Sequence, residues 1–348
     1  MIKKLRIPRK WLTYFAIIGM VSSSPALISC GASDQSEMKS AAQSAEVADS
    51  VDILLADPTI FEDNGTYYVY GTDGDRPDHG FRVYASTDLE TWQGPVGAKE
   101  GFALVKDDVF GDKGFWAPQI WKEGTTYYMA YTANENIAIA TSNSPLGPFT
   151  QEQKVPIIQE GKQIDPFIYQ DEDGKKYLYH VKLQEGNRIF VAELNDGYGS
   201  IKSNTLQECL SATLPWENTN NASWPVAEGP TVIKRDGKYY MFYSANDFRN
   251  PDYAVGVAVA DQAAGPWTKV GNEALLSRVQ TNWAGTGHGD VFRANNTWYY
   301  VCHTHFSDNA VGPRRTAIVP FNWDQSDSLG IKKPEFKGSE IQFLHASE

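Results

Sequence analysis

The pattern that decides the fold is EGPTVIKRDGKYYMFY, residues 228–243 of a chain of 348 residues. It starts with a strand-forming segment, turns at Arg235-Asp236-Gly237 and continues as a second strand-forming segment that is rich in aromatic residues. Two such segments joined by a short turn that contains glycine are typical of a β-hairpin. The sequence therefore predicts two antiparallel strands over residues 228–243.

Four further copies of this hairpin pattern occur along the chain. They open with ADPTIF (56–61), WAPQIW (116–121), IDPFIY (164–169) and, more loosely, HGDVF (288–292). The aromatic residues that take the same place in the five copies are Tyr68, Tyr128, Tyr177, Tyr240 and Tyr300. A strand repeat of roughly 50–60 residues indicates a β-propeller, in which each repeat is one four-stranded blade. We therefore predict an all-β, five-bladed β-propeller with almost no helix.

The opening strand of each repeat is expected to be the innermost strand of its blade, so the five openings should line a central channel. The opening residues that this brings together are Asp57, Trp116, Asp165, Glu228 and His288. One carboxylate before a proline is readily explained as a turn residue. Three carboxylates that converge on one axis indicate a functional site.

The N-terminal segment has the pattern of an export signal. Its basic residues, Lys3, Lys4, Arg6, Arg9 and Lys10, precede an apolar run at 11–21, and LISC (27–30) fits a lipobox. A plain secretory signal with an incidental Cys30 is the alternative. We expect a lipoprotein signal peptide at 1–29, acylation of Cys30, a flexible tether at 30–50 and a catalytic propeller domain at 51–348. This predicts an exported lipoprotein at the cell surface or on the periplasm-facing outer membrane.

The charge balance narrows the class of partner. Cleavage before Cys30 would remove five of the 31 basic residues and none of the 43 acidic ones. Such an acidic protein disfavours nucleic acid and anionic lipid and suits a neutral substrate. We expect a monomer that meets the membrane only through its anchor. Cys209 and Cys302 lie in different repeats and are interpreted as unpaired, and no cysteine spacing indicates a zinc site.

Two segments depart from the repeat. Residues 205–226 form an insertion just before Glu228, and its Trp216 and Trp224 either stack on a sugar ring or pack under their own loop. Residues 304–315 form a polar loop that ends in Arg314 and Arg315.

The three carboxylates suit the hydrolysis of a glycosidic bond. That reaction needs one carboxylic acid to protonate the leaving oxygen and one carboxylate to act on water or on the anomeric carbon. Like charges and partial burial raise the pKa of one member of such a set. We expect Asp57 to be the ionised base and Glu228 the protonated acid, with Asp165 keeping Glu228 protonated and oriented.

The five openings, taken in order, resemble glycoside hydrolase family 43 over about residues 52–324. The resemblance implies a five-bladed propeller and an inverting hydrolase of arabinose- or xylose-containing plant polysaccharides. It implies Asp57 as the general base, Asp165 as the pKa modulator and Glu228 as the general acid.

The resemblance also implies the surroundings of the carboxylates. The expected substrate-binding residues are Phe115, Trp116, Trp224, His288, Arg314 and Arg315. Trp116 would form the sugar platform, and Arg314 or Arg315 would reach the modulating aspartate or the substrate. No cofactor is required. His288 would lie on the propeller axis, where family members often hold a water or a calcium ion, and any metal contact of His288 would pass through water.

We expect an exo-acting α-L-arabinofuranosidase, because Trp116, the 304–315 loop and the 205–226 insertion should close the channel mouth into a pocket. Within the family, β-xylosidase, galactofuranosidase and endo-arabinanase are the alternatives. The invertase-like clan opens with Asn-Asp-Pro-Asn-Gly and carries Arg-Asp-Pro and Glu-Cys, and this chain departs from each motif. A lipid-anchored sugar-binding propeller without catalysis is the alternative of another class.

Overall fold

A computed structural model describes residues 50–328 and 330–347. The predicted signal peptide, Cys30 and nearly all of the predicted tether lie outside these residues. The compact unit that contains the described residues is Ala48–Glu348. The regular structure of its described part is almost entirely β-strand, with one short α-helix, α1 (Arg278–Thr281), and five 3-10 turns, so almost no helix is present, as the sequence predicts. No helix among the described residues is long and apolar enough to cross a membrane.

The described strands form five sheets. The first contains β1 (Ser50–Asp52), β2 (Leu55–Asp63), β3 (Thr66–Asp73), β4 (Gly80–Ser86), β5 (Trp92–Gln93), β6 (Phe102–Val105) and β23 (His345–Ser347). The second contains β7 (Trp116–Glu123), β8 (Thr126–Ala133) and β9 (Asn136–Ser142). The third contains β10 (Gln163–Gln170), β11 (Lys176–Leu183), β12 (Asn187–Glu193) and β13 (Gln207–Leu210).

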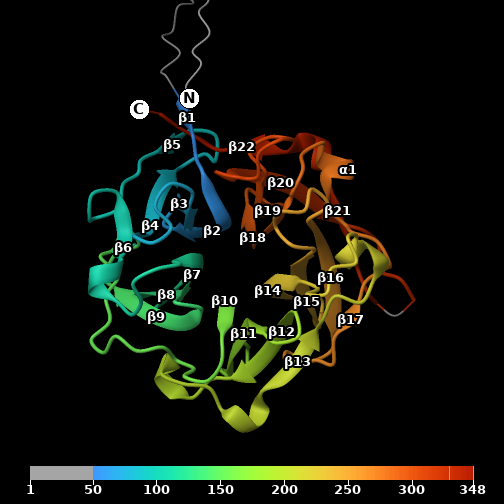
Figure 1. Cartoon of the computed structure of the whole chain (residues 1–348), viewed down its shortest axis with the longest axis horizontal. Helices are drawn as coiled ribbons and strands as arrows, with labels where there is room; N and C mark the ends of the chain where they lie inside the picture. The colour runs from blue at the N-terminus through green and yellow to red at the C-terminus, as the bar shows by residue number, and fades with distance from the viewer. Residues whose placement is uncertain (1–49, 329, 348) are drawn as a thin grey trace, which may run out of the picture. The chain divides into compact units, whose positions relative to one another are not determined.

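The fourth and fifth sheets complete the set. The fourth contains β14 (Ala227–Arg235), β15 (Lys238–Ala245), β16 (Ala254–Ala260) and β17 (Thr268–Lys269). The fifth contains β18 (Gly287–Ala294), β19 (Thr297–Thr304), β20 (Arg315–Trp323), β21 (Pro334–Phe336) and β22 (Gln342–Phe343). Figure 1 shows the sheets following one another around a common centre, with β2, β7, β10, β14 and β18 innermost. The fold is therefore an all-β propeller.

The prediction of five four-stranded blades is wrong in detail. Four sheets of the described chain contain four or more strands, and the β7–β9 sheet contains only three, so the described residues give four complete blades instead of five. Beyond β9, the only pairing at that edge is the isolated bridge between Thr141 and Thr150. The bridge follows the turn at Gly147-Pro148, at the place where β17 follows Gly265-Pro266 in the fourth sheet.

The first sheet joins the two ends of the described chain. Strand β23 pairs with β1 in antiparallel register and with β5 in parallel register. The hydroxyl of Thr316 on β20 donates to the carbonyl of Leu55 and accepts the N–H of Leu55, so the fifth sheet is also bonded to the first. These bonds close the ring of sheets between the fifth sheet and the first.

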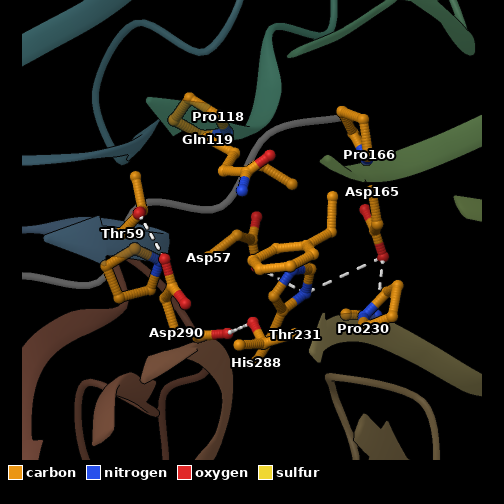
Figure 2. Close-up of a pocket in the computed structure, with 15 residues that line it drawn as sticks. Asp57, Thr59, Pro118, Gln119, Asp165, Pro166, Pro230, Thr231, His288 and Asp290 are labelled. Atoms are coloured by element: carbon orange, nitrogen blue, oxygen red, sulfur yellow. Dashed lines mark hydrogen bonds and ion pairs between the residues drawn. The ribbon is translucent and has the colours of Figure 1, made fainter. Parts of the chain in front are cut away.

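Each innermost strand has a shift of pairing register near its start, as expected of a β-bulge. One residue at each shift has a positive φ: Asp57 (49°), Ala117 (45°), Asp165 (56°), Gly229 (59°) and His288 (40°). Each of the five, with the two residues that follow it, lines a narrow axial cavity of about 20 Å³, which Figure 2 shows. Four of the five carry a side chain in this disfavoured conformation, and such strain is concentrated at functional sites.

The bulges correct the alignment of the repeats. The residues equivalent to Asp57 are Ala117 and Gly229, each one position after the Trp116 and Glu228 that the sequence pattern suggested. Trp116 and Glu228 instead line a wider cavity of about 400 Å³. In the fifth sheet the same error applies to the tyrosine. Tyr299 pairs with Phe292 as Tyr68 pairs with Phe61, so Tyr299 and not Tyr300 is the equivalent residue.

Apolar and aromatic side chains fill the seams between neighbouring sheets. Trp92, which follows the third strand of the first sheet, and Phe149, in the corresponding place of the second, are fully buried. Trp267 packs against Tyr179 of the preceding sheet, with ring centroids 6.1 Å apart. These contacts fix the angular position of each sheet and hence the position of its innermost strand at the axis.

Candidate active site

The wider cavity is the candidate active site. It is lined by Asp57, Trp116, Ile164, Asp165, Asn187, Trp224, Val226, Glu228, Asp247, Phe248, Arg249, His288 and Arg314. A concave site of a few hundred Å³ with a few convergent polar groups is the usual form of a small-molecule site. The three predicted carboxylates share this one cavity, although they come from three different sheets.

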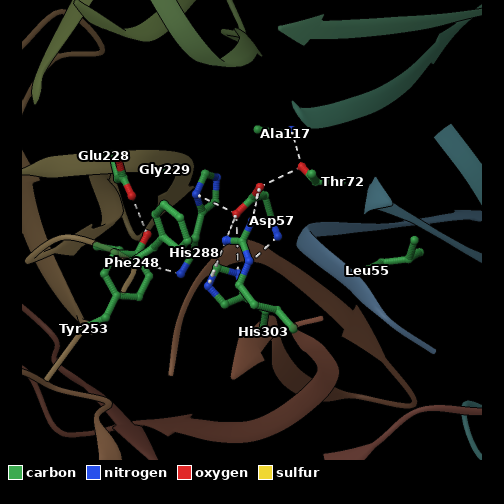
Figure 3. Close-up of polar contacts among 12 residues, drawn as sticks. Leu55, Asp57, Thr72, Ala117, Glu228, Gly229, Phe248, Tyr253, His288 and His303 are labelled. Carbon is green, nitrogen blue, oxygen red and sulfur yellow. Dashed lines mark hydrogen bonds and ion pairs between the residues drawn. The ribbon is translucent and has the colours of Figure 1, made fainter. Parts of the chain in front are cut away.

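Asp57 is surrounded by groups that favour its ionised form (Figure 3). Its Oδ2 accepts the hydroxyl of Thr72 at 2.6 Å, and Arg314 donates to both carboxylate oxygens, at 2.9 and 3.4 Å. Nδ1 of His288 lies 3.3 Å from Oδ1. Burial alone would raise the pKa of Asp57, but Arg314, His288 and His303 outweigh it and hold the pKa far below its usual range.

His303 lies beneath Asp57 and fixes its backbone. The N–H of Asp57 donates to Nδ1 of His303 at 3.1 Å, so Nδ1 carries no proton in this arrangement. Burial, and then the charge of Arg314, lower the pKa of His303 well below its usual value. His303 is therefore neutral, and it supports the strained Asp57 bulge as a hydrogen-bond acceptor.

No basic side chain lies as close to Asp165 as Arg314 lies to Asp57. Its Oδ2 accepts the backbone N–H of Gly229 at 3.1 Å and lies 3.9 Å from Nδ1 of His288 (Figure 2). Burial, and then the charges of Glu228 and Asp57, raise the pKa of Asp165 well above its usual value. At the same place in two repeats, one aspartate thus stays ionised and the other resists ionisation.

Glu228 is held by two donors. Oε1 accepts the hydroxyl of Tyr253 at 2.9 Å, and Oε2 accepts Nδ2 of Asn187 at 2.8 Å. Burial raises the pKa of Glu228 to about 7, against the opposing effect of the two hydrogen bonds. The cavity therefore combines a carboxylate that stays ionised with a carboxylic acid that keeps its proton near neutral pH. This is the combination that acid–base hydrolysis of a glycoside requires.

The other predicted site residues are divided by the structure. Trp116, Trp224, His288 and Arg314 line the wider cavity. Phe115 does not, because its side chain is fully buried and stacks on Tyr131 in the core between the first and second sheets.

The second arginine also lies away from the site. Nε of Arg315 is 3.2 Å from Asp52, and its guanidinium lies 3.8 Å from the ring centre of Phe343. The two tryptophans of the insertion differ in the same way. Trp224 lines the cavity, whereas Trp216 packs against Tyr243 with ring centroids 6.0 Å apart.

Four residues that contact the carboxylates were missed in the sequence: Thr72, Asn187, Tyr253 and His303. Thr72 and His303 occupy the same position, near the end of the second strand, where that strand pairs with the start of the innermost one. Asn187 starts the third strand of its sheet, and Tyr253 precedes the third strand of the next. A polar residue at these strand ends was the available signal.

The axial cavity offers oxygen ligands, from Thr59, Gln119, Thr231 and Asp290. The carboxylate of Asp290 already accepts the hydroxyl of Thr59 and the N–H of Val291, both at 2.7 Å. Among the described residues, no group of three or more His, Cys, Asp or Glu side chains is arranged to hold a metal ion. The carboxylate and imidazole groups of the described residues therefore do not by themselves form a calcium site.

Comparison with known proteins places this site in context. The family model described as Glycosyl hydrolases family 43 matches residues 51–329. A crystal structure of an endo-1,4-β-xylanase from Bacteroides thetaiotaomicron is 37% identical, with a TM-score of 0.75, over 86% of this chain and 98% of that one. A β-D-galactofuranosidase of Aspergillus niger is 24% identical over 79% of this chain and 81% of its own length. A xylosidase/arabinosidase of Humicola insolens is 26% identical over 81% of this chain and 98% of its own length.

Proposed function

The chain belongs to glycosyl hydrolase family 43 and is a glycosidase, and on this premise we propose that it is an inverting, exo-acting α-L-arabinofuranosidase of plant cell-wall polysaccharides or oligosaccharides. One observation carries the proposal. Asp57, held ionised by Arg314 and Thr72, shares a cavity with Glu228, whose pKa is raised to about 7.

In the proposed mechanism, Asp57 takes a proton from a water molecule as that water attacks the anomeric carbon. Glu228 gives its proton to the glycosidic oxygen of the leaving group, so the bond breaks without the release of an alkoxide. Arg314 keeps Asp57 ionised and fixes the direction of its carboxylate. Asp165, when ionised, opposes the loss of the Glu228 proton through charge repulsion.

The exo mode is supported by the side chains at the cavity mouth. Trp116, Trp224 and Phe248 are aromatic residues from three different segments, and together they offer flat faces on which a single sugar ring can stack. Phe248 is held in place because Arg314 lies 4.7 Å from its ring centre and His305 is 2.8 Å from its carbonyl oxygen. A fixed aromatic wall of this kind favours a terminal sugar over a continuous chain.

Two other sugars compete with α-L-arabinofuranose as the proposed substrate. The relatives are named as a xylosidase/arabinosidase and a galactofuranosidase, so β-xylosidase is the second candidate and galactofuranosidase the third. A panel of p-nitrophenyl glycosides tests the choice directly. The highest kcat/KM on the α-L-arabinofuranoside supports the proposal, and the highest kcat/KM on the β-D-xyloside replaces it with the second candidate.

Products from polymers test the exo mode. Debranched arabinan and arabinoxylan should yield free monosaccharide from the first time point. Early products dominated by longer oligosaccharides would indicate an open groove and endo action, the mode for which the Bacteroides endo-1,4-β-xylanase is named. No hydrolysis of any glycoside, combined with measurable binding, would favour the non-catalytic sugar-binding alternative.

We also propose that all five sheets are blades of a five-bladed propeller. Each sheet supplies one innermost strand and one set of three residues to the axial cavity. In the β7–β9 sheet, the bridge between Thr141 and Thr150 stands where the fourth strand would be. A crystal structure in which one of these sheets pairs edge to edge with its neighbour would contradict this count.

We further propose that the protein is a lipoprotein anchored through Cys30, which lies outside the described residues. The support is the basic head, apolar run and LISC motif of the sequence. The wild-type protein should partition with membranes, and Cys30→Ala should abolish processing by the lipoprotein peptidase. A fully soluble periplasmic wild-type protein would contradict the anchor.

A further inference from the structure

Trp224 is connected to Glu228 by a chain of two hydrogen bonds. The indole Nε1–H of Trp224 donates to Oδ1 of Asn187 at 2.9 Å, and Nδ2 of Asn187 donates to Oε2 of Glu228 at 2.8 Å. An indole nitrogen is a donor only, so the atom of Asn187 that faces it must be the oxygen. The amide nitrogen is then left facing Glu228.

The end of the 205–226 insertion is docked at this point of the fold. The N–H of Asn187 donates to the carbonyl of Pro225 at 2.9 Å, and Asn187 forms a parallel bridge with Val226. Gly186 has a φ of 123°, and a Cβ there would come within 2.5 Å of the Pro225 oxygen. Only glycine therefore allows the insertion to approach β12 so closely, and this approach aligns Trp224 with Asn187.

We propose that Trp224 is a positioning residue, whose indole N–H orients the Asn187 amide so that its nitrogen donates to Glu228. The inference rests on the proposed role of Glu228 as the general acid. It gives the insertion a second task besides forming the cavity wall. The indole face of Trp224, which is 48% exposed, stays available to a sugar ring, while its N–H acts on the acid through Asn187.

The consequence is electrostatic and has a definite sign. A donor to the carboxylate favours the ionised form, so the Asn187 bond lowers the pKa of Glu228 against the upward effect of burial. Without the indole N–H, the amide is free to turn over and offer its oxygen to the protonated acid. The pKa of Glu228 then rises further. The N–H donor that stabilises the carboxylate is replaced by an oxygen that accepts a hydrogen bond from the protonated acid.

Other groups also face Glu228 and stay unchanged in this comparison. The acidic ones are Asp57, Asp165 and Asp247, and the hydroxyl of Tyr253 donates to Oε1. The two arginines and the histidine that line the same cavity are Arg249, Arg314 and His288. None of them hydrogen-bonds the Trp224 indole nitrogen or the side-chain amide of Asn187, so replacing the indole N–H leaves their direct contacts in place.

The insertion supplies a matched control. Trp216 lies in the same segment, its Nε1 is buried without a hydrogen-bond partner, and it does not line the cavity. Trp224→Phe and Trp216→Phe therefore remove the same N–H group and keep an aromatic ring. Only the first breaks a link to Glu228.

The experiment measures the pH dependence of kcat/KM for the full-length wild-type protein and both variants. The substrate is the methyl glycoside of the sugar chosen by the panel, because its leaving group requires protonation. Activity is lost as pH rises through the pKa of the acid. Trp224→Phe should therefore move the alkaline limb to higher pH, by about one unit. Trp216→Phe should leave the limb where it is, and Asn187→Ala should move it in the same direction as Trp224→Phe.

An alkaline limb of Trp224→Phe that superimposes on the wild type, with Asn187→Ala shifted, would overturn the role of Trp224. A shift of equal size in Trp216→Phe would overturn it as well. Glu228→Gln separates this failure from failure of the proposed function. If that variant hydrolyses the methyl glycoside with the wild-type alkaline limb, Glu228 is not the acid and the proposed mechanism itself fails.

Discussion

Gly229 donates its backbone N–H to Oδ2 of Asp165 at 3.1 Å, although the two residues belong to neighbouring sheets. Because Gly229 directly follows Glu228, this bond ties the modulating carboxylate to the bulge that carries the acid. Bulge N–H groups in the other sheets bind a side chain at the end of the preceding sheet's second strand: Ala117 to Thr72, Asp165 to Thr132, His288 to Ser244 and Asp57 to His303.

The third sheet lacks such an acceptor, because its equivalent residue is Val181, which pairs with Ile164 as Thr132 pairs with Trp116. The carboxylate of Asp165 accepts the orphan N–H in its place. Asp165 therefore has both a structural and an electrostatic connection to Glu228. These two connections can be separated by mutation.

Asp165→Asn keeps an oxygen that can accept the Gly229 N–H and removes the charge. Asp165 and Glu228 are close, buried carboxyls that resist being ionised together, so the last proton of the pair is lost at higher pH than a lone carboxyl would lose it. With a neutral amide at position 165, the pKa of Glu228 should fall because this repulsion is gone. We expect a slower enzyme whose alkaline limb lies at lower pH, by about one unit, on a methyl glycoside. A pH–rate profile checks this, and an alkaline limb displaced to higher pH would contradict the assigned role.

Asp57→Ala should abolish turnover on every substrate. The buried ionised carboxylate is the proposed base for the attacking water, and a general base contributes about 10²–10⁴-fold. The loss should be equally severe for p-nitrophenyl and methyl glycosides, since both need the water. Initial rates on the two substrates measure this, and activity within tenfold of the wild type would exclude Asp57 as the base.

Glu228→Ala should depend on the leaving group. A sugar or methanol needs a proton to depart, whereas p-nitrophenolate departs unaided. The ratio of rates for the p-nitrophenyl and methyl glycosides should therefore rise strongly in this variant. Equal losses on both substrates would indicate that Glu228 does not donate a proton.

Arg314→Met should displace the acidic limb of kcat/KM to higher pH. The pKa of Asp57 is held down by the Arg314 guanidinium, and activity is lost as pH falls through the pKa of a base that must be ionised. The neighbouring Arg315→Met is the control, because Arg315 pairs with Asp52 away from the cavity. An acidic limb that moves in both variants would show an indirect effect on stability.

The repeated openings made the propeller and its three carboxylates predictable. An Asp-Pro pair or a Glu-Gly-Pro triplet before an apolar strand is visible in one dimension, and its recurrence predicts convergence on one axis. The register within each opening was also visible, because Pro58, Pro118, Pro166 and Pro230 stand at the same place in four of the five openings. The alignment of Trp116 with Asp57 is wrong because it does not follow these prolines. Ala117 and Gly229, like Asp57, each directly precede one and lie at the bulge of their strand.

The hydrogen-bond partners of the carboxylates, by contrast, could not be predicted from the sequence. Asn187 lies 41 positions before Glu228 and starts a strand, and Tyr253 lies 25 positions after Glu228, just before a strand. No motif marks them, since one hydrogen bond across a cavity needs only one suitable side chain. Phe115 was expected in the site from the family resemblance. It directly precedes β7, and its side chain is buried in the core, where it stacks on Tyr131.

The most direct test of the account is the stereochemistry of the first product. A base that activates water from the opposite face requires the Asp57 and Glu228 carboxyls to lie roughly 6.5–9.5 Å apart and gives inversion. Proton NMR during the first minutes of hydrolysis of the fastest p-nitrophenyl glycoside identifies the anomer before it equilibrates. With Asp57 as a base that activates water, the first product should be the anomer opposite to that of the substrate. A first product with the configuration of the substrate would make Asp57 a nucleophile and contradict the mechanism.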